Sequence, residues 1–90
     1  MESTIKALDD PVRRKILEIL KEKPCSVGEI LSKLEITGAT LSHHLKILRN
    51  ADLVYCKRDG NSMIYQINTS VVEDVITWLI GFTNKGGKIE

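Results

Sequence analysis

The chain is short of cysteine and lacks a long apolar segment. Its 90 residues include only Cys25 and Cys56, which are too few and too far apart for a disulfide scaffold and which fit a reduced cytoplasm. No apolar run reaches the roughly 18 residues that a membrane span needs. The chain also does not open with the basic and then apolar segments of a secretory signal. The sequence therefore predicts a cytoplasmic protein.

Residue patterns typical of enzymes are absent as well. No paired carboxylates, phosphate-binding loop or nucleophile with a matching base is visible. His43 and His44 are adjacent in the sequence, so on a helix they point to different sides and make a poor catalytic pair. We therefore predict that the protein is not an enzyme.

The chain also lacks a large net charge, which is +1. Residues 1–36 balance seven basic against seven acidic side chains, and residues 63–90 are slightly acidic. The positive excess lies in residues 37–62, with Lys46, Arg49, Lys57 and Arg58 against Asp52 and Asp59. Such a small excess would give one subunit only weak affinity for a polyanion, which two linked subunits would strengthen.

Length and composition predict one domain over residues 1–90, since the chain is 42% hydrophobic and 28% charged. A chain this short buries only about 60–65% of its unfolded surface, so a partner subunit would add stability.

Capping residues predict three helices in the first part of the chain. A short helix covers residues 3–8. Asp10 and Pro11 begin a second helix as N-cap and first helical residue, and Pro24 ends it. Ser26 and Glu29 form a capping box for a third. The apolar residues at helical spacing are Val12, Ile16, Ile19 and Leu20, then Val27, Ile30, Leu31 and Leu34.

A helix and a hairpin follow. Thr37 caps a helix that runs to about Ala51. Two strands, residues 53–57 and 62–67, flank a turn with Asp59 and Gly60, a strong hairpin signal. A last helix covers residues 71–82. This order predicts an α+β, mostly α fold: a winged helix-turn-helix with five helices and a two- or three-stranded β-wing.

Helical geometry divides residues 37–51 into two sides. At about 100° per residue, Leu41, Leu45 and Leu48 share the buried side. His43 lies about 160° from Leu45, near the helix N-terminus, where groove-reading residues belong; the alternative is an ordinary surface histidine. Ala39, Thr40, Ile47 and Asn50 share its side. His44 lies at the boundary, where we expect it to bond within the fold.

Other polar residues allow two interpretations each. Thr40 and Ser42 can donate to phosphates or base edges, or they can be solvated. Side chains at the tip of the wing, residues 57–62, can reach the DNA backbone or minor groove, or they can form a charged edge that resists aggregation. These are Lys57, Arg58, Asn61 and Ser62. For the triplet Arg13, Arg14 and Lys15 we expect a solvated face.

The last helix has an apolar face too broad for one small domain to cover. We predict that part of it, together with the first helix, pairs across the two-fold axis of a homodimer, unless the whole face packs within its own domain. The candidate dimer residues are Ile5, Leu8, Val71, Val75, Trp78, Leu79 and Phe82.

Three segments together resemble one family. LDDPVRRKILEIL, LSHHLKILRNADLV and KRDGNSMIYQI are similar to the ArsR/SmtB family of bacterial winged-helix repressors. The resemblance implies a homodimer that binds an inverted-repeat operator, with Ser42 and His43 in the groove. The candidate DNA-binding residues are Val27, Ala39, Thr40, Ser42, His43, Lys46, Lys57, Arg58, Asn61 and Ser62.

The chain departs from the metal-sensing members of this family. Ser26, Gly28 and Leu31 stand where thiolates would be, and no histidine follows His44. We therefore predict no metal site and no cofactor. Cys56 alternates with Val54 in a strand, which favours a small buried side chain over a redox sensor. A metal- or thiol-responsive repressor remains one alternative, and a winged-helix module that binds protein is another.

The ending SVVEDVITWLIGFTNKGG resembles the short SdpR-type autorepressors of the family. This resemblance implies a repressor of its own operon without a small-molecule inducer. It also implies a membrane-embedded immunity or signal protein that sequesters the repressor.

Overall fold

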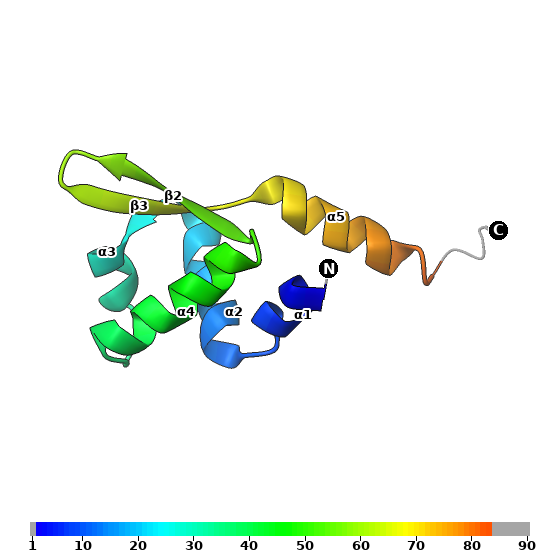
Figure 1. The fold of residues 1–90 in the computed structure, drawn as a ribbon, viewed down its shortest axis with the longest axis horizontal. Coiled ribbons are helices and arrows are strands. Elements are labelled where there is room, and N and C mark those ends of the chain that lie inside the picture. Colours follow the sequence, from blue (N-terminus) through cyan, green and yellow to red (C-terminus); the bar gives the residue numbers. More distant parts are fainter. Residues whose placement is uncertain (1, 84–90) are drawn as a thin grey trace.

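The computed structural model describes residues 2–83. In chain order the elements are α1 (Glu2–Leu8), α2 (Pro11–Glu22), β1 (Cys25–Ser26), α3 (Val27–Leu31), α4 (Gly38–Asn50), β2 (Val54–Asp59), β3 (Ser62–Ile67) and α5 (Thr69–Ile80). Helices α1 to α4 and the sheet form one body, and α5 extends away from it (Figure 1). The predicted winged helix-turn-helix with five helices is confirmed.

The predicted caps begin α2, α3 and α4. The Asp10 carboxylate accepts hydrogen bonds from the backbone N–H of Val12 and of Arg13, and Ser26 and Glu29 form a reciprocal capping box. The N–H of Arg13 is the main cause of a lowered pKa at Asp10. This cap therefore contributes its full stability above the ordinary titration range of aspartate, and the contribution is lost as the pH falls through the lowered pKa.

The sheet has the order β1-β3-β2, with both pairs antiparallel. Its third strand, β1, is only two residues long and precedes α3, where the sequence showed no strand signal. Asp59 pairs with Ser62, so the turn consists of Gly60 and Asn61, and Asp59, which was expected within the turn, ends β2. Gly60 has a φ of 63°, the left-handed conformation that a two-residue hairpin loop requires and that glycine adopts freely.

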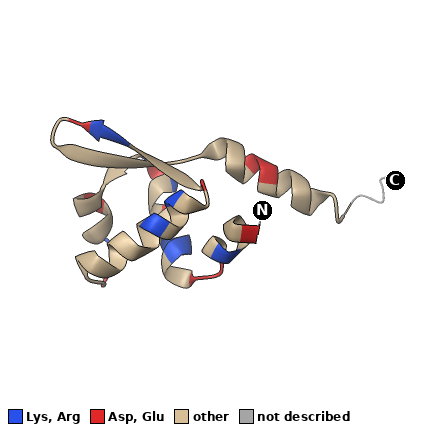
Figure 2. Cartoon of the chain, in the orientation of Figure 1, with Lys and Arg blue, Asp and Glu red and all other residues tan. Residues whose placement is uncertain are grey.

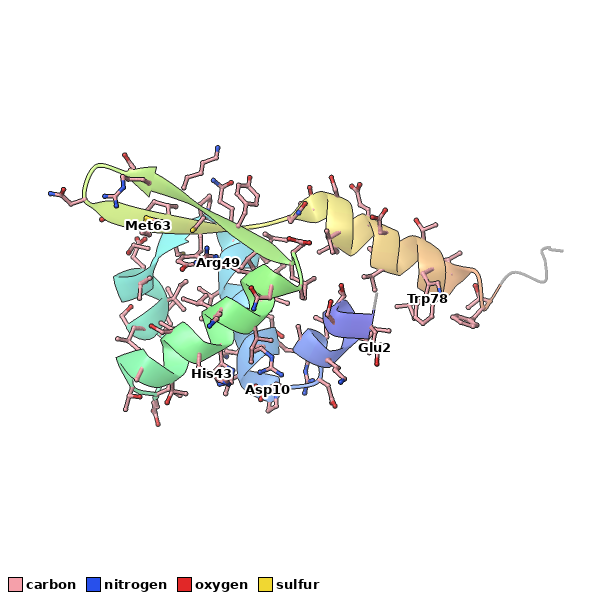
Figure 3. All side chains as sticks on the ribbon, viewed as in Figure 1. Glu2, Asp10, His43, Arg49, Met63 and Trp78 are labelled. Carbon is pink, nitrogen blue, oxygen red and sulfur yellow. The ribbon has the colours of Figure 1, made fainter. Side chains whose placement is uncertain are left out.

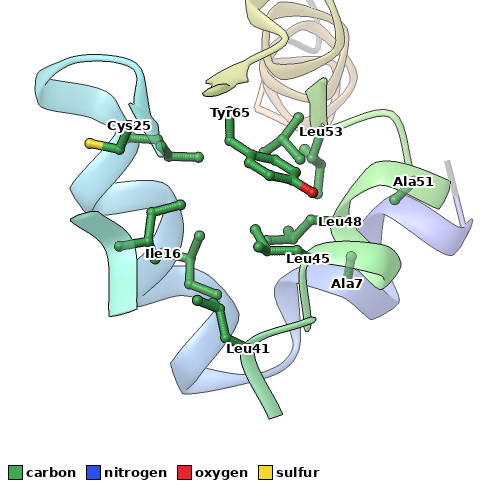
Figure 4. Close-up of a cluster of buried hydrophobic side chains, with 12 residues drawn as sticks. Ala7, Ile16, Cys25, Leu41, Leu45, Leu48, Ala51, Leu53 and Tyr65 are labelled. Atoms are coloured by element: carbon green, nitrogen blue, oxygen red, sulfur yellow. The ribbon is translucent and has the colours of Figure 1, made fainter. Parts of the chain in front are cut away.

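The core lies where the helices meet the inner face of the sheet (Figure 4). Leu41, Leu45 and Leu48 of α4 are buried as predicted, together with Ile16 of α2 and Tyr65 of β3. Ile47, expected on the outer side of α4, instead packs partly buried against this core. Because the buried stripe of α4 is broad, the exposed side of the helix lies mainly in its N-terminal half.

Helix α4 ends in a Schellman motif with a strained residue. The backbone N–H of Leu53 donates to the carbonyl of Leu48 at 3.0 Å, and that of Asp52 donates to Arg49 at 2.9 Å. Asp52 itself has a φ of 59°, in the left-handed region that disfavours residues other than glycine. Within residues 2–83, no helix is long and apolar enough to cross a membrane.

We predict that Asp52→Gly raises the free energy of unfolding by about 0.5–1 kcal/mol, because glycine adopts the left-handed conformation without strain. Chemical denaturation measures the change. Asp52→Asn removes the same charge but keeps a side chain, and it should give a smaller gain. Asn50→Gly, two residues earlier in regular helix, should destabilise. Equal stability of Asp52→Gly and the wild type would contradict the strain argument.

Candidate nucleic-acid interface

Helices α3 and α4, joined by residues 32–37, form the helix-turn-helix, and the β2–β3 wing follows α4 directly (Figure 1). Thr37 caps α4 by accepting a hydrogen bond from the N–H of Thr40 at 3.1 Å. The Thr37 hydroxyl in turn donates to the Thr40 hydroxyl oxygen at 3.0 Å. The hydroxyl hydrogen of Thr40 is therefore free to donate outward from the first turn of the helix.

The candidate residues of α4 are all solvent-exposed and lie outside the stripe of buried leucines. They are Ala39, Thr40, Ser42, His43 and Lys46. Figure 3 labels His43 on the outer surface of α4. Val27, at the start of α3, is half-buried and packs against the core, so only part of its side chain faces solvent. The wing residues Lys57, Arg58, Asn61 and Ser62 are all exposed.

The two adjacent histidines differ as predicted. His43 is exposed, whereas His44 is 8% exposed and its Nδ1 lies 3.2 Å from an Nη of Arg13. Arginine can only donate, so Nδ1 of His44 accepts this hydrogen bond. Their ring centroids lie 5.6 Å apart. A buried histidine thus supports the helix directly beside an exposed one that is free to contact a ligand.

The prediction of a solvated face holds for Arg14 and Lys15, which are exposed, and is wrong for Arg13, whose side chain is only 12% exposed. The Nε of Arg13 donates to the carbonyl of Ala7 at 2.7 Å, and Arg14 donates to the carbonyl of Leu8, also at 2.7 Å. These carbonyls end α1 and have no partner within it, so the two arginines cap its C-terminus. The sequence could not reveal this role, because charge runs alone do not show which backbone atoms they meet.

Basic residues lie on both α4 and the wing (Figure 2). Lys57 is paired with Ile64 and Arg58 with Met63. Successive residues of a strand point to opposite faces of the sheet. Cys56 is paired with the buried Tyr65, so Arg58, two residues further, shares the face that is turned toward the helices. Lys57 points to the other face. Lys57 and Arg58 therefore cannot both reach one phosphate from the same face of the wing.

The thiols do not form a sensor pair. Cys25 and Cys56 are the partners of Tyr65 on its two sides in the sheet, so a whole strand separates them. Strands lie about 4.8 Å apart, which places the two Cα atoms roughly 10 Å from each other, beyond the reach of a disulfide. In the described part of the chain, no three His, Cys, Asp or Glu side chains lie close enough to hold a metal ion.

Helix α5 contains no buried residue. Its exposed apolar side chains include Ile76, Trp78 and Leu79. Phe82, in the turn that follows α5, is 71% exposed, and its ring meets that of Trp78 edge to face with centroids 5.0 Å apart. Ile5 of α1 is also exposed, whereas Leu8 and Val71 are half-buried against the core and Val75 is half-buried as well. Between α2 and α5 runs an apolar groove of about 660 Å³.

Comparison with known proteins identifies relatives of this fold. The family described as bacterial regulatory protein, arsR family, matches residues 10–55. The transcriptional repressor SdpR of Bacillus subtilis is 41% identical over 86 residues, which are 96% of each chain. An arsenical resistance operon repressor of Staphylococcus aureus is 33% identical over 84% of this chain and 73% of its own.

Solved structures agree with the fold. The crystal structure of Mycobacterium tuberculosis Rv0081 has a TM-score of 0.72 and 38% identity, covering 89% of this chain and 82% of that one. A winged helix-turn-helix DNA-binding domain of Mycobacterium bovis Mb0332, described as homodimeric, has a TM-score of 0.76 and covers 93% of this chain and 78% of its own. Its sequence is 24% identical, so it supports the fold alone.

We predict that Thr37→Ala lowers the free energy of unfolding by about 1 kcal/mol, because it removes the side-chain cap of α4. Thr37→Ser keeps the hydroxyl and is the matched control, expected within a few tenths of a kcal/mol of the wild type. Urea denaturation compares the three proteins. If the alanine and serine variants were equally stable, the cap would contribute nothing.

Proposed function

The chain belongs to the arsR family of bacterial regulatory proteins, and from that premise we propose that it is a transcriptional repressor that binds a palindromic operator as a homodimer. The observation that carries this proposal is the exposed polar side of α4, opposite a fully buried leucine stripe and beside a basic wing. An α-helix with this division fits the major groove, with its N-terminal residues toward the base edges.

The chemistry of each position supports a division of roles. His43, Ser42 and the free hydroxyl hydrogen of Thr40 can donate to base acceptors or phosphates. Lys46 supplies charge from the same helix. Arg58 shares the helix-facing side of the wing and therefore reaches a backbone that runs along α4 more directly than Lys57 does. Ala39 and the exposed part of Val27 add close contact with the duplex.

The homodimer is proposed from α5. Its exposed face can be removed from water by a second copy, together with Ile5 of α1. A two-fold axis between the copies would separate the recognition helices by one DNA turn, about 34–36 Å. Since residues 37–62 of one subunit have a net charge of only +2, linkage of two subunits is what makes operator binding tight.

We further propose that the protein represses its own operon and is sequestered by a membrane-embedded immunity or signal protein. Similarity to SdpR over nearly the whole chain supports this part. Co-purification with the membrane proteins of the same operon tests it, and failure to recover any of them would remove the partner from the proposal while leaving DNA binding intact.

We predict that His43→Ala weakens binding to the operator by about 1–3 kcal/mol, the usual worth of a specific base contact. Fluorescence anisotropy with DNA from the promoter of its own gene, against scrambled DNA at two salt concentrations, measures the effect. Unchanged promoter affinity would make His43 an ordinary surface histidine. Equal, weak binding of the wild type to both DNAs would argue that the operator is not in this promoter or that the fold binds protein.

Wing variants are the contrast in the same assay. Arg58→Ala should weaken promoter and scrambled DNA alike and flatten the dependence on salt, because a phosphate contact carries no sequence information. Lys57→Ala should act in the same direction but less. Lys15→Ala, which removes one charge from an exposed position of α2, is the control for a general effect of net charge.

We predict that Leu79→Glu converts the dimer to a monomer at micromolar concentration, because a carboxylate would be buried in an apolar contact. Thr77→Glu adds the same charge two residues earlier, on the opposite side of α5, and should leave the dimer intact. Light scattering after size-exclusion chromatography gives the mass. A wild type that is already monomeric would contradict the dimer.

A further inference from the structure

The guanidinium of Arg13 joins three helices at one point. Besides its bond to the carbonyl of Ala7, it donates from one Nη to the carbonyl of Lys6 at 3.3 Å and from the other to Nδ1 of His44 at 3.2 Å. The Asp10 carboxylate lies 3.9 Å away, and the Arg13 side chain is only 12% exposed. One planar group of α2 thus contacts the end of α1 and the middle of α4.

This geometry uses the properties of arginine specifically. A helix C-terminus carries partial negative charge on its free carbonyls, which favours a cation that donates several hydrogen bonds. The rigid fork of the guanidinium places donors toward the α1 carbonyls and the imidazole at the same time, which a lysine ammonium at the end of a flexible chain does not. The arrangement therefore fixes distance and orientation as well as supplying charge.

A second contact joins α1 to the C-terminal end of α4. The buried hydroxyl of Thr4 in α1 donates to the carbonyl of Ala51, the C-cap of α4, at 3.4 Å. Helix α1 is therefore joined to α4 beside His43, through His44, and again at the helix end. Rotation or sliding of α4 against α1 would break both contacts.

We infer that Arg13 is a positioning residue for DNA recognition, which holds the recognition helix α4 in fixed register with α1 through His44. The inference rests on the proposed function, because α1 with its exposed Ile5 belongs to the proposed dimer face. The tie transmits the geometry of the dimer to the two recognition helices. Loss of the tie would let their separation vary, which weakens simultaneous binding to two half-sites but not the attraction of either subunit to phosphate.

The test compares Arg13→Gln with Lys15→Gln, which removes one positive charge from the neighbouring exposed turn of α2. Anisotropy measures affinity for promoter and scrambled DNA, and light scattering and thermal melting check that each protein is a folded dimer. Relative to Lys15→Gln, we expect Arg13→Gln to bind the promoter about tenfold more weakly. Both variants should bind scrambled DNA with the same affinity. Equal promoter affinity of the two variants, or equal losses on both DNAs, would overturn the inference.

Two substitutions of His44 test the tie from its other side and decide the matter if Arg13→Gln does not fold. His44→Asn places an amide oxygen near the position of Nδ1 and should keep the promoter preference. His44→Phe keeps a ring but removes the acceptor, and should lose the preference as Arg13→Gln does. Identical behaviour of the Asn and Phe variants would overturn the inference. A wild type without promoter preference would instead contradict the proposed repression of its own operon.

Discussion

The rest of the structure depends on burial of one side of α4. Leu41, Leu45 and Leu48 are held by Ile16 of α2 and Tyr65 of the sheet in a continuous core. Because side chains at a spacing of three and four residues share one side of a helix, burial of these leucines decides which residues face outward. The exposure of His43 is thus a consequence of the leucine stripe.

The size of the domain imposes the second constraint. A body of this length has one small core, which is already filled by α1 to α4 and the sheet. Helix α5 contributes only half-buried valines at its start, and the side chains beyond them remain in contact with water. Apolar area of this extent at the end of a small domain is typical of an interface. The element that the core cannot accommodate is therefore the one available for association.

Local signals predicted most of the fold. The caps at Asp10, Ser26 and Thr37 and the leucine spacing in α4 depend on residues close in the sequence, and all are confirmed. The errors concern interactions between distant segments. The strand β1 forms only because β3, some 40 residues later, offers a free edge. The environment of Arg13 depends on the ends of α1 and on His44, 31 residues away. For the candidate site, sequence separated the exposed His43 from the buried His44, but it could not show that Lys57 and Arg58 point to opposite faces of the wing.

In the proposed dimer, the small net charge makes geometry the main source of selectivity. A strongly basic surface would bind any duplex tightly, whereas a net charge of +2 on residues 37–62 gives each subunit little affinity by itself. In the proposed dimer, affinity comes from the second subunit binding at high effective concentration, which requires both recognition helices to meet their half-sites together. The affinity is then sensitive to any contact that fixes α4 relative to the dimer helices. The bonds from Arg13 to α1 and to His44, and from Thr4 to Ala51, lie on that path. In the proposed dimer, a small domain with little net charge would therefore discriminate between DNA sequences by rigidity at the helix junction behind its recognition helix.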